Sequence, residues 1–495
     1  MMKTRKFLLG ALAIAAVTTA GLVACKKSIS DKKSDRSLTA GITAVCDCAT
    51  FSKDSTITGN IGANLHLVAT TRYKLNGLVF VINGATVTID AGTRIEGVRG
   101  APGGGLVVTR GSKLVAVGTA HCPIVFTSDQ TSPVSGDWSG VILLGKAQTN
   151  NAGAFVEGIN NTAFPGIDLQ YGSTDSIVGG VNVNNDTSGI LKYVRIEYAG
   201  FALSLNNEIN GLTLAGVGRG TVLDYIEVFK SNDDAFEFFG GTVNASHLLS
   251  IDALDDMFDT DNGYKGSISF ALGVADTTRK DQSQSNGFES DDNSTGTVTA
   301  GAPVTDPHYS NVTIVGVDSV RASSQPTVGG LTVRYGRGGH FRRASRFHIQ
   351  NTIVFGYNYG ISMDNQFGGG DSTEGQFNIG NSVLTNVFSA GYGKPSPAGV
   401  GPWSVETNGV AATGVNFLRA FNPNIPPSSG NVGFLGNASP SPNPFNLANP
   451  FSRSDISNFF VNFGEDAFSF GAFPDGEDWT LDPNGCSSVW VKLHE

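Results

Sequence analysis

Hydrophobic residues along most of this chain occur in short β-branched runs separated by Gly, Asn and Asp, and helical periodicity is nearly absent. Two such runs, 84–89 and 111–116, have the same form, a small turn residue followed by a short strand, and lie 27 residues apart. Runs of this kind bounded by turn residues are typical of β-strands. Glycine supplies 64 of the 495 residues, about twice its usual share of roughly 7%. The pattern therefore predicts an all-β chain with many turns.

The middle of the chain repeats more sharply. The sequence Asp-Asp-Ala-Phe-Glu at 233–237 returns as Asp-Asp-Met-Phe-Asp at 255–259, 22 residues later, and in looser form as Ser-Asn-Gly-Phe-Glu at 285–289. An earlier version, Asn-Asn-Glu-Ile-Asn, occupies 206–210. Runs led by Asn recur nearer the C-terminus, at 311–315, 351–355 and 381–385.

Short strands and turns that repeat every 20 to 30 residues or so indicate a solenoid. We predict a right-handed parallel β-helix with loop insertions, in which successive coils lie about 4.8 Å apart and similar side chains stack. Phe236, Phe258 and Phe288 should then form an internal column that Ile209 continues. A β-propeller is the alternative, but its blades need roughly 40 residues, and the 22-residue spacing is too short for one.

The first 24 residues have the features of an export signal, with a basic start and an apolar run at 7–17 that is too short to span a bilayer. The run leads into Leu-Val-Ala-Cys, which resembles the bacterial lipobox and implies cleavage before Cys25 and acylation of that cysteine. A secretory signal with a chance cysteine is the alternative. Lys26 replaces the Asp that usually retains lipoproteins at the inner membrane, so we expect a lipid anchor in the outer membrane, on either face.

Composition predicts the remaining domain boundaries. Residues 25–55 are polar and should form a flexible tether behind the lipidated cysteine. We expect the β-helix to span 56–395, with 146–188 and 271–284 leaving the stack as loops. The strand pattern fades in 396–495, which should fold back and cap the last coil, because a bare end exposes an unpaired strand edge.

The net charge is −10, and loss of the signal with its three basic residues leaves about −13. This charge disfavours a nucleic-acid partner, whereas a polysaccharide or an envelope protein is compatible with it. The sequence leaves the oligomeric state open.

Four cysteines remain after Cys25, an even number that suggests disulfides in an oxidising compartment. Cys46 and Cys48 are too close in sequence to bond each other easily, so we expect each to pair with Cys122 or Cys486. Free buried thiols are the alternative.

Acidic residues occupy matching positions of successive repeats. Glu237, Asp259 and Glu289 should form one column with Asn210 before them, and carboxylates about 4.8 Å apart repel one another when partly buried. Ca²⁺, which accepts six to eight oxygen ligands, would offset this repulsion, so Ca²⁺ is the expected cofactor. Solvated acids at a turn, or catalytic acids, are the alternatives. The candidate ligands are Asp233, Asp234, Glu237, Asp255, Asp256, Asp259, Asp261, Glu289 and Asp291.

Two sets of basic residues bear on function. An arginine-rich stretch could bind a sulfate, a uronate or a lipid phosphate, or could balance nearby acids; its candidate residues are Arg334, Arg337, Arg342 and Arg343, followed by Arg346. Lys230, Lys265 and Arg279 lie near the acids in sequence and are candidates for the base of a lyase, or partners of surplus acids. The histidines are dispersed without metal-ligand spacing: His121, His247, His308 and His348.

Two functions follow from these residues. The first is a non-catalytic β-helix lipoprotein of the cell envelope that binds glycan or protein or has a structural role. The second is a Ca²⁺-dependent polysaccharide lyase or another glycan-active enzyme. A Lys or Arg projecting into a groove beside the acids, with aromatic rings for a sugar, would favour the enzyme. We assign no catalytic residue.

Several segments resemble a family of glycine-rich exported β-helix lipoproteins of diderm bacteria. The similar segments are 136–145, 191–200, 207–212, 238–244 and 285–291. The resemblance runs from about 56 to 395 and returns at 477–480. It implies a pectin-lyase-like fold and an exported location, and it brings no catalytic residues.

Overall fold

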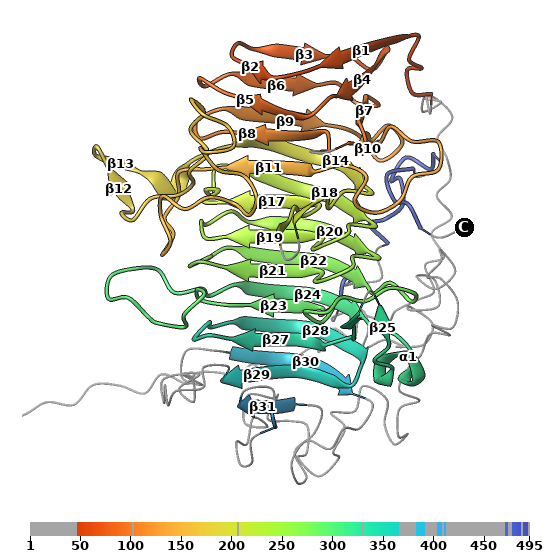
Figure 1. Cartoon of the computed structure of the whole chain (residues 1–495). Helices are drawn as coiled ribbons and strands as arrows, with labels where there is room; N and C mark the ends of the chain where they lie inside the picture. Colours follow the sequence, from red (N-terminus) through yellow and green to blue (C-terminus); the bar gives the residue numbers. More distant parts are fainter. Residues whose placement is uncertain are drawn as a thin grey trace, which may run out of the picture. The chain divides into compact units, whose positions relative to one another are not determined.

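The chain winds into a parallel β-helix, because nearly every strand of its two large sheets pairs in parallel with strands of the preceding and following coils (Figure 1). This confirms the predicted fold and excludes a propeller, whose blades are antiparallel. The computed structural model describes residues 47–100, 103–204, 207–328, 330–365, 383–391, 403–407, 410–411, 471–473, 478–486 and 489–493.

One wall of the described stack is a 12-stranded sheet. Its strands are β2 (Asn60–Ile61), β5 (Leu78–Val81), β8 (Gly105–Val108), β11 (Gly140–Leu144), β17 (Leu212–Ala215), β19 (Phe236–Phe239), β21 (Phe258–Asp261), β23 (Phe288–Ser290), β27 (Arg337–Arg342), β29 (Tyr359–Asn365), β31 (Trp403–Thr407) and β32 (Val410–Ala411).

A 14-stranded sheet forms the rest of each coil. Its strands are β1 (Lys53–Ile57), β3 (Leu65–Leu67), β4 (Thr71–Leu75), β6 (Thr86–Ile89), β7 (Arg94–Gly97), β9 (Lys113–Val117), β10 (Ile124–Ser128), β14 (Gly189–Glu197), β18 (Val222–Phe229), β20 (Ala245–Ile251), β22 (Ser267–Val274), β24 (His308–Val315), β28 (His348–Tyr357) and β30 (Val383–Gly391).

The 14-stranded sheet is bent, so that it supplies two walls of the coil. In the first coils these walls are separate strands, but β14 pairs with β9 through its first half and with β10 through its second. Between the halves Tyr193 has a left-handed backbone, with φ of 50°, which bends the strand. The same bend recurs in later strands at Tyr225, His247, Phe270, Asn311 and Asn351, with φ between 49° and 56°.

The interior is filled by columns of apolar side chains. Phe258 stacks between Phe236 and Phe288, with ring centroids 5.6 and 6.1 Å away, so the predicted column is confirmed. Its predicted continuation is wrong, because Leu212 and not Ile209 pairs with Phe236. Ile209 belongs instead to an apolar cluster on the outside of the 12-stranded sheet.

The first pair of repeats and the Asn-led repeats near the C-terminus also test the predicted pairing between coils. The strands at 86–89 and 113–116 pair as predicted. In the Asn-led repeats, Ile314 pairs with Val354 as expected, whereas Ile353 pairs with Phe388. The alignment through 381–385 was therefore wrong by five residues.

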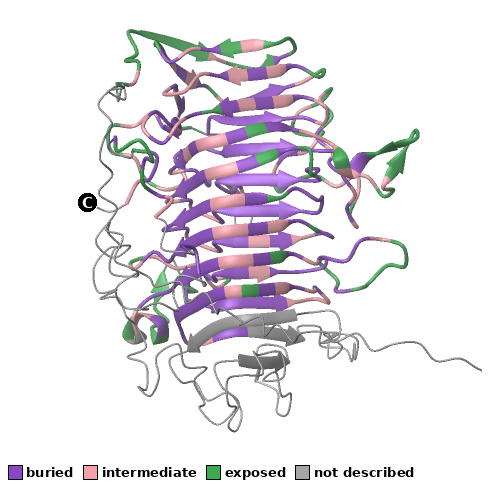
Figure 2. Ribbon diagram, turned by 180° about the vertical axis from the view of Figure 1, so that it is seen from behind, coloured by how far each residue is buried: buried purple, intermediate pink, exposed green. Residues whose placement is uncertain are grey.

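The insertion at 146–188 leaves the stack as predicted. It covers part of the outer face of the 12-stranded sheet, where Leu169 and Tyr171 pack in one cluster with Phe80 and Leu144. It carries β12 (Ile177–Val178), β13 (Val181–Asn182) and the 3-10 helix η1 (Val183–Asn185). Figure 2 shows the hairpin β12–β13 and the first coil as mainly exposed, in contrast to the buried middle of the stack.

The second predicted insertion is only partly correct, because residues 271–274 belong to β22. Short elements occur in the remaining loops that the structure describes. They are β15 (Ala202–Ser204), β16 (Asn207–Glu208), α1 (Ser319–Ser323), β25 (Thr327–Val328) and β26 (Leu331–Thr332).

The described C-terminal residues lie along the side of the stack and do not cap its last coil. Trp490 is buried edge-on against the rings of Tyr193 and Tyr225, at 5.8 and 5.7 Å. The N–H of Ala472 donates to Oγ1 of Thr313 at 2.9 Å. The predicted end of the β-helix at 395 is also too early, since β31 still pairs with β29. The outer face of the 14-stranded sheet is apolar here, so the C-terminal residues pack on it and remove that surface from water.

Candidate functional site

The acidic residues gather on the outer face of the 12-stranded sheet, where side chains alternate with the inward-facing phenylalanines. The register pairs Glu237 with Asp259, and Asp259 with Glu289, as the repeat predicts. Thr213, not Asn210, precedes Glu237 in this column. Asn210 still contacts the column, because its Nδ2 donates to Oε2 of Glu237.

A second row of acids lies in the turn just before these strands. The N–H of Asp256 donates to Oδ1 of Asp234 at 2.8 Å, and the N–H of Asn286 donates to Oδ1 of Asp256 at 2.6 Å. Oδ1 of Asn286 in turn accepts the N–H of Arg337 at 2.8 Å. This ladder of side chain to backbone hydrogen bonds joins successive coils, so Asp256 already has a structural role.

Five of the predicted ligands come close enough to share a cation. Asp233, Asp234 and Asp255 form one triplet, and Asp234, Glu237 and Asp259 form another, with the candidate ligand atoms of each triplet within 4.8 Å of one another. Oδ1 of Asp255 and Oδ1 of Asp259 are buried and make no hydrogen bond. An unpartnered buried carboxylate oxygen is costly unless a cation or proton compensates it.

The pKa values of the clustered acids also indicate that their negative charge needs compensation. Burial, followed by repulsion from Glu289 and Asp291, raises the pKa of Asp259 to about 8. Burial and neighbouring carboxylates also raise the pKa values of the other acids in the cluster. These are Asp233, Asp234, Glu237, Asp255, Asp256 and Asp261. The cluster therefore favours bound protons or a bound cation.

Two of the four remaining predicted ligands, Glu289 and Asp291, are neutralised by arginine. Arg342 contacts Glu289 and also Asp291, whose Oδ1 lies 2.9 Å from its Nε, while Arg343 contacts Asp291 at 2.5 Å. Burial opposes ionisation of Glu289, but Arg342, His340 and Arg343 outweigh it and lower the pKa of Glu289 to about 2. Arg342 and Arg343 thus face acids of their own chain.

The other two predicted anion-binding arginines lie apart from this pair. Arg337 is buried, contacts Oε1 of Gln284 and lies over the ring of Tyr359, 5.7 Å from its centroid. Arg334 is exposed. The structure therefore does not gather the four arginines into one surface for an external anion.

An open cavity of about 660 Å³ adjoins the first acid triplet. The carboxylates that line it come from the stack and from three separate loops: Glu157, Glu208, Asp233, Asp255 and Asp281. We call this cavity the acidic groove. Glu157, Glu208 and Asp281 were missed from the sequence because they lie outside the repeat, and only the fold brings them to the groove.

The two basic side chains that line the acidic groove, Arg279 and Lys280, both bond to neighbouring groups. Nε of Arg279 donates to Asp276 at 2.7 Å, and its Nη2 donates to the carbonyl of Asp252 at 3.1 Å. Nζ of Lys280 donates to the carbonyl of Ser324 at 2.7 Å. No aromatic side chain lines the groove among the described residues.

The two lysines predicted near the acids do not line the groove. Lys230 lies 3.9 Å from Asp252, with its ammonium over the ring of Phe229. Lys265 is exposed.

The predicted cysteines fall partly within the described residues. Cys48 is bonded to Cys122, 74 residues away, and Cys486 is also in a disulfide. Cys46 and the predicted lipidation site, Cys25, lie outside the described residues.

A stack of parallel coils in two large sheets defines a parallel β-helix protein. The sequence matches the family model for the pectate-lyase-like beta helix domain over residues 59–413. The chain therefore belongs to this family. Comparison with curated proteins and with solved structures found no match.

Proposed function

We propose that this β-helix is an envelope lipoprotein that binds Ca²⁺ at the two acid triplets and, through the ion, an anionic glycan in the acidic groove. The observation that carries the proposal is the sharing of Asp234 by two triplets, next to the unpartnered buried oxygens of Asp255 and Asp259. Ca²⁺ takes carboxylate oxygens in flexible geometry, and it removes the repulsion that raises the pKa values of these acids.

The charge of the groove supports a role for the ion in ligand binding. Carboxylates outnumber the basic side chains that line it, and both of those are already bonded to neighbours. An anionic polymer would be repelled by this surface without a cation. A divalent ion with open coordination positions can bind the protein and a uronate carboxylate at once.

The same contacts favour binding over cleavage. A lyase needs a base within hydrogen-bond reach of the proton it removes. The guanidinium of Arg279 donates hydrogen bonds to Asp276 and to backbone carbonyls, including that of Asp252. Lys280 is held by carbonyls in the neighbouring loop. These side chains support the loops of the groove.

The export signal supports the location. The lipobox-like segment before Cys25 and the polar tether that follows would hold the β-helix at a membrane surface by acyl chains. Lys26 favours the outer membrane. In the part of the chain that the structure describes, no helix is long and apolar enough to cross a membrane.

The test is binding of the full chain to polygalacturonate, with a neutral glucan as control, in millimolar Ca²⁺ and in chelator. We expect retention on the acidic polymer only with Ca²⁺. Retention should be lost in the double variant Asp233→Asn/Asp259→Asn, which removes one charge from each triplet, and kept in Asp175→Asn, an exposed acid of the insertion.

Equal binding in chelator, or equal binding to the neutral glucan, would refute the proposal. Appearance of an unsaturated, ultraviolet-absorbing product during incubation would replace the binding function with a lyase.

A further inference from the structure

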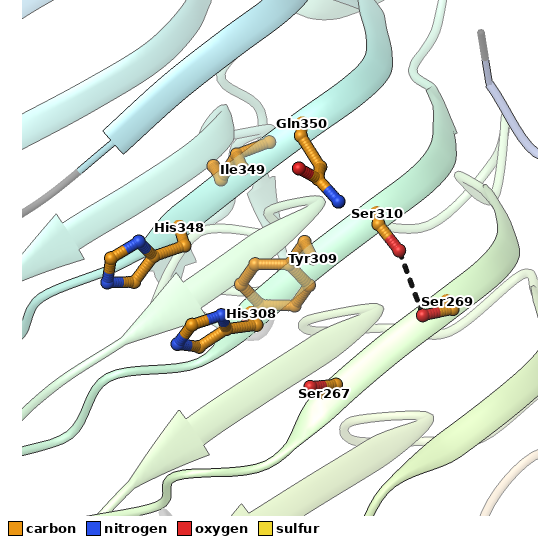
Figure 3. Close-up of a pocket in the computed structure, with 8 residues that line it drawn as sticks. All are labelled: Ser267, Ser269, His308, Tyr309, Ser310, His348, Ile349 and Gln350. Atoms are coloured by element: carbon orange, nitrogen blue, oxygen red, sulfur yellow. Dashed lines mark hydrogen bonds between the residues drawn. The ribbon is translucent and has the colours of Figure 1, made fainter. Parts of the chain in front are cut away.

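A second polar site lies on the bent sheet, away from the acidic groove. His308 and His348 are register partners on β24 and β28, adjacent strands of the stack. Their imidazoles lie parallel on the outer surface (Figure 3), with ring centroids 4.1 Å apart and an interplanar angle of 17°. Equal positions on neighbouring coils thus bring together two imidazoles that are 40 residues apart in sequence.

Asp306 completes the group. Its Oδ1 lies 3.2 Å from Nε2 of His348, yet this oxygen is buried and makes no hydrogen bond. The main chain of Asp306 is held against the neighbouring coil, because its N–H donates to the carbonyl of Tyr264 at 2.8 Å. The N–H of His348 donates to the carbonyl of Pro307 at 2.9 Å, which ties the start of β28 to the same segment.

We propose that Asp306, His308 and His348 form a Zn²⁺ site. Their candidate ligand atoms all lie within 4.8 Å of one another. Zn–N and Zn–O bonds of 2.0–2.2 Å at a tetrahedral angle place two ligand atoms about 3.4 Å apart. The 3.2 Å between Asp306 and His348 is close to that separation.

The ligand types select the metal. Imidazole nitrogen suits zinc and other borderline transition ions, whereas Ca²⁺ takes oxygen ligands. This distinguishes the site from the acid triplets, which contain only carboxylates. An ion pair between Asp306 and His348 accounts for one contact only. It leaves His308 stacked on His348 without a polar partner among the described residues.

Three protein ligands leave the fourth position of a tetrahedral ion open, as in catalytic zinc sites and unlike closed structural ones. The two histidines line one end of a cavity of about 210 Å³. Its other polar side chains are Ser267, Ser269, Ser310 and Gln350 (Figure 3). His308 is exposed, so the open position would be accessible to water or a small oxygen-bearing ligand.

The test is calorimetric titration of the metal-stripped full chain with Zn²⁺, in millimolar Ca²⁺ so that the acid triplets are occupied. We expect one Zn²⁺ per chain from this site and at least a tenfold weaker affinity in His308→Ala and in His348→Ala. The matched control is His66→Ala, which removes another histidine of the same sheet, paired with Asp90 at 2.7 Å. It should bind like the wild type.

Two further measurements make the outcome decisive. Co²⁺ added to the wild-type chain should give the visible spectrum of a tetrahedral site with nitrogen ligands, which needs no variant to fold. Asp233→Asn/Asp259→Asn should keep full Zn²⁺ affinity, which separates this site from the acidic groove. Absence of stoichiometric Zn²⁺ binding, or unchanged affinity in folded His308→Ala and His348→Ala, would overturn the proposal.

Discussion

The carboxylate of Asp234 accepts a 2.8 Å hydrogen bond from the backbone N–H of Asp256, the residue at the same position one coil later. Asp256 repeats the arrangement with Asn286. The acids of this turn therefore join coils as well as carrying charge. Asp255 and Asp256 therefore differ in role although they are adjacent in sequence. Asp256 joins two coils by a hydrogen bond, whereas Asp255 has a buried oxygen without such a bond.

Replacing Asp256 should separate its hydrogen bond from its charge. Asp256→Asn keeps an oxygen that accepts the N–H of Asn286, so we expect little loss of stability. Asp256→Ala leaves that buried N–H without a partner, which should lower the free energy of unfolding by about 1–3 kcal/mol. Urea unfolding of both variants measures the difference, and equal losses would show that the ladder contributes nothing.

Calcium should stabilise the fold through the acid triplets. An ion that binds only the native state adds about 2.7 kcal/mol when its concentration is a hundredfold above Kd. Thermal melting in millimolar Ca²⁺ should therefore occur at a higher temperature than in chelator. Asp233→Asn/Asp259→Asn should abolish the difference while Asp175→Asn retains it. Melting of the wild type that ignores both calcium and chelator would contradict a cation site.

Without calcium, stability should fall as the pH rises. The pKa of Asp259 is about 8 in the folded chain, against about 3.9 for an unfolded aspartate. The folded state then binds more protons between these values, so its stability is greatest near pH 4 and is lost progressively toward pH 8. Melting temperatures in chelator across this range should show the decline, with a smaller slope in Asp259→Asn. A rise in stability over the same range would refute the raised pKa.

The aromatic column should be a major source of stability. Phe258 is fully buried between Phe236 and Phe288. Phe258→Ala should lower the free energy of unfolding by ~3–5 kcal/mol, because the vacated volume cannot be refilled. Val178→Ala, at an exposed hairpin position, is the control and should change it by less than about 0.5 kcal/mol. Urea titration compares them, and a small effect at Phe258 would contradict tight packing between coils.

Membrane attachment should depend on a single cysteine. Cys25→Ser removes the atom that would be acylated, so the variant should move from the membrane pellet to the soluble envelope fraction. Fractionation followed by immunoblotting measures this, with Cys48→Ser as a control that keeps the signal intact. A Cys25→Ser protein that still sediments with membranes would count against lipidation.

The repeats in the sequence determined the stacking of coils, the inward column at Phe236 and Phe258 and the outward pairing of Glu237 with Asp259. They could do so because parallel strands at a fixed spacing force equal positions into contact. The prediction failed where loops change length between coils. The hairpin β15–β16 lies just before the position at which Leu212 takes the place expected for Ile209.

Only the tertiary structure decided which polar groups meet. The acidic groove combines Asp233 with Glu157 and Asp281, and the arginine-rich stretch supplies Arg342 to neutralise Glu289. His308 and His348 looked dispersed in the sequence because β27 and a long loop lie between their strands. When loops differ in length, equivalent residues of successive coils are no longer evenly spaced in the sequence. The hydrogen-bonded register of the strands still places them side by side in the structure.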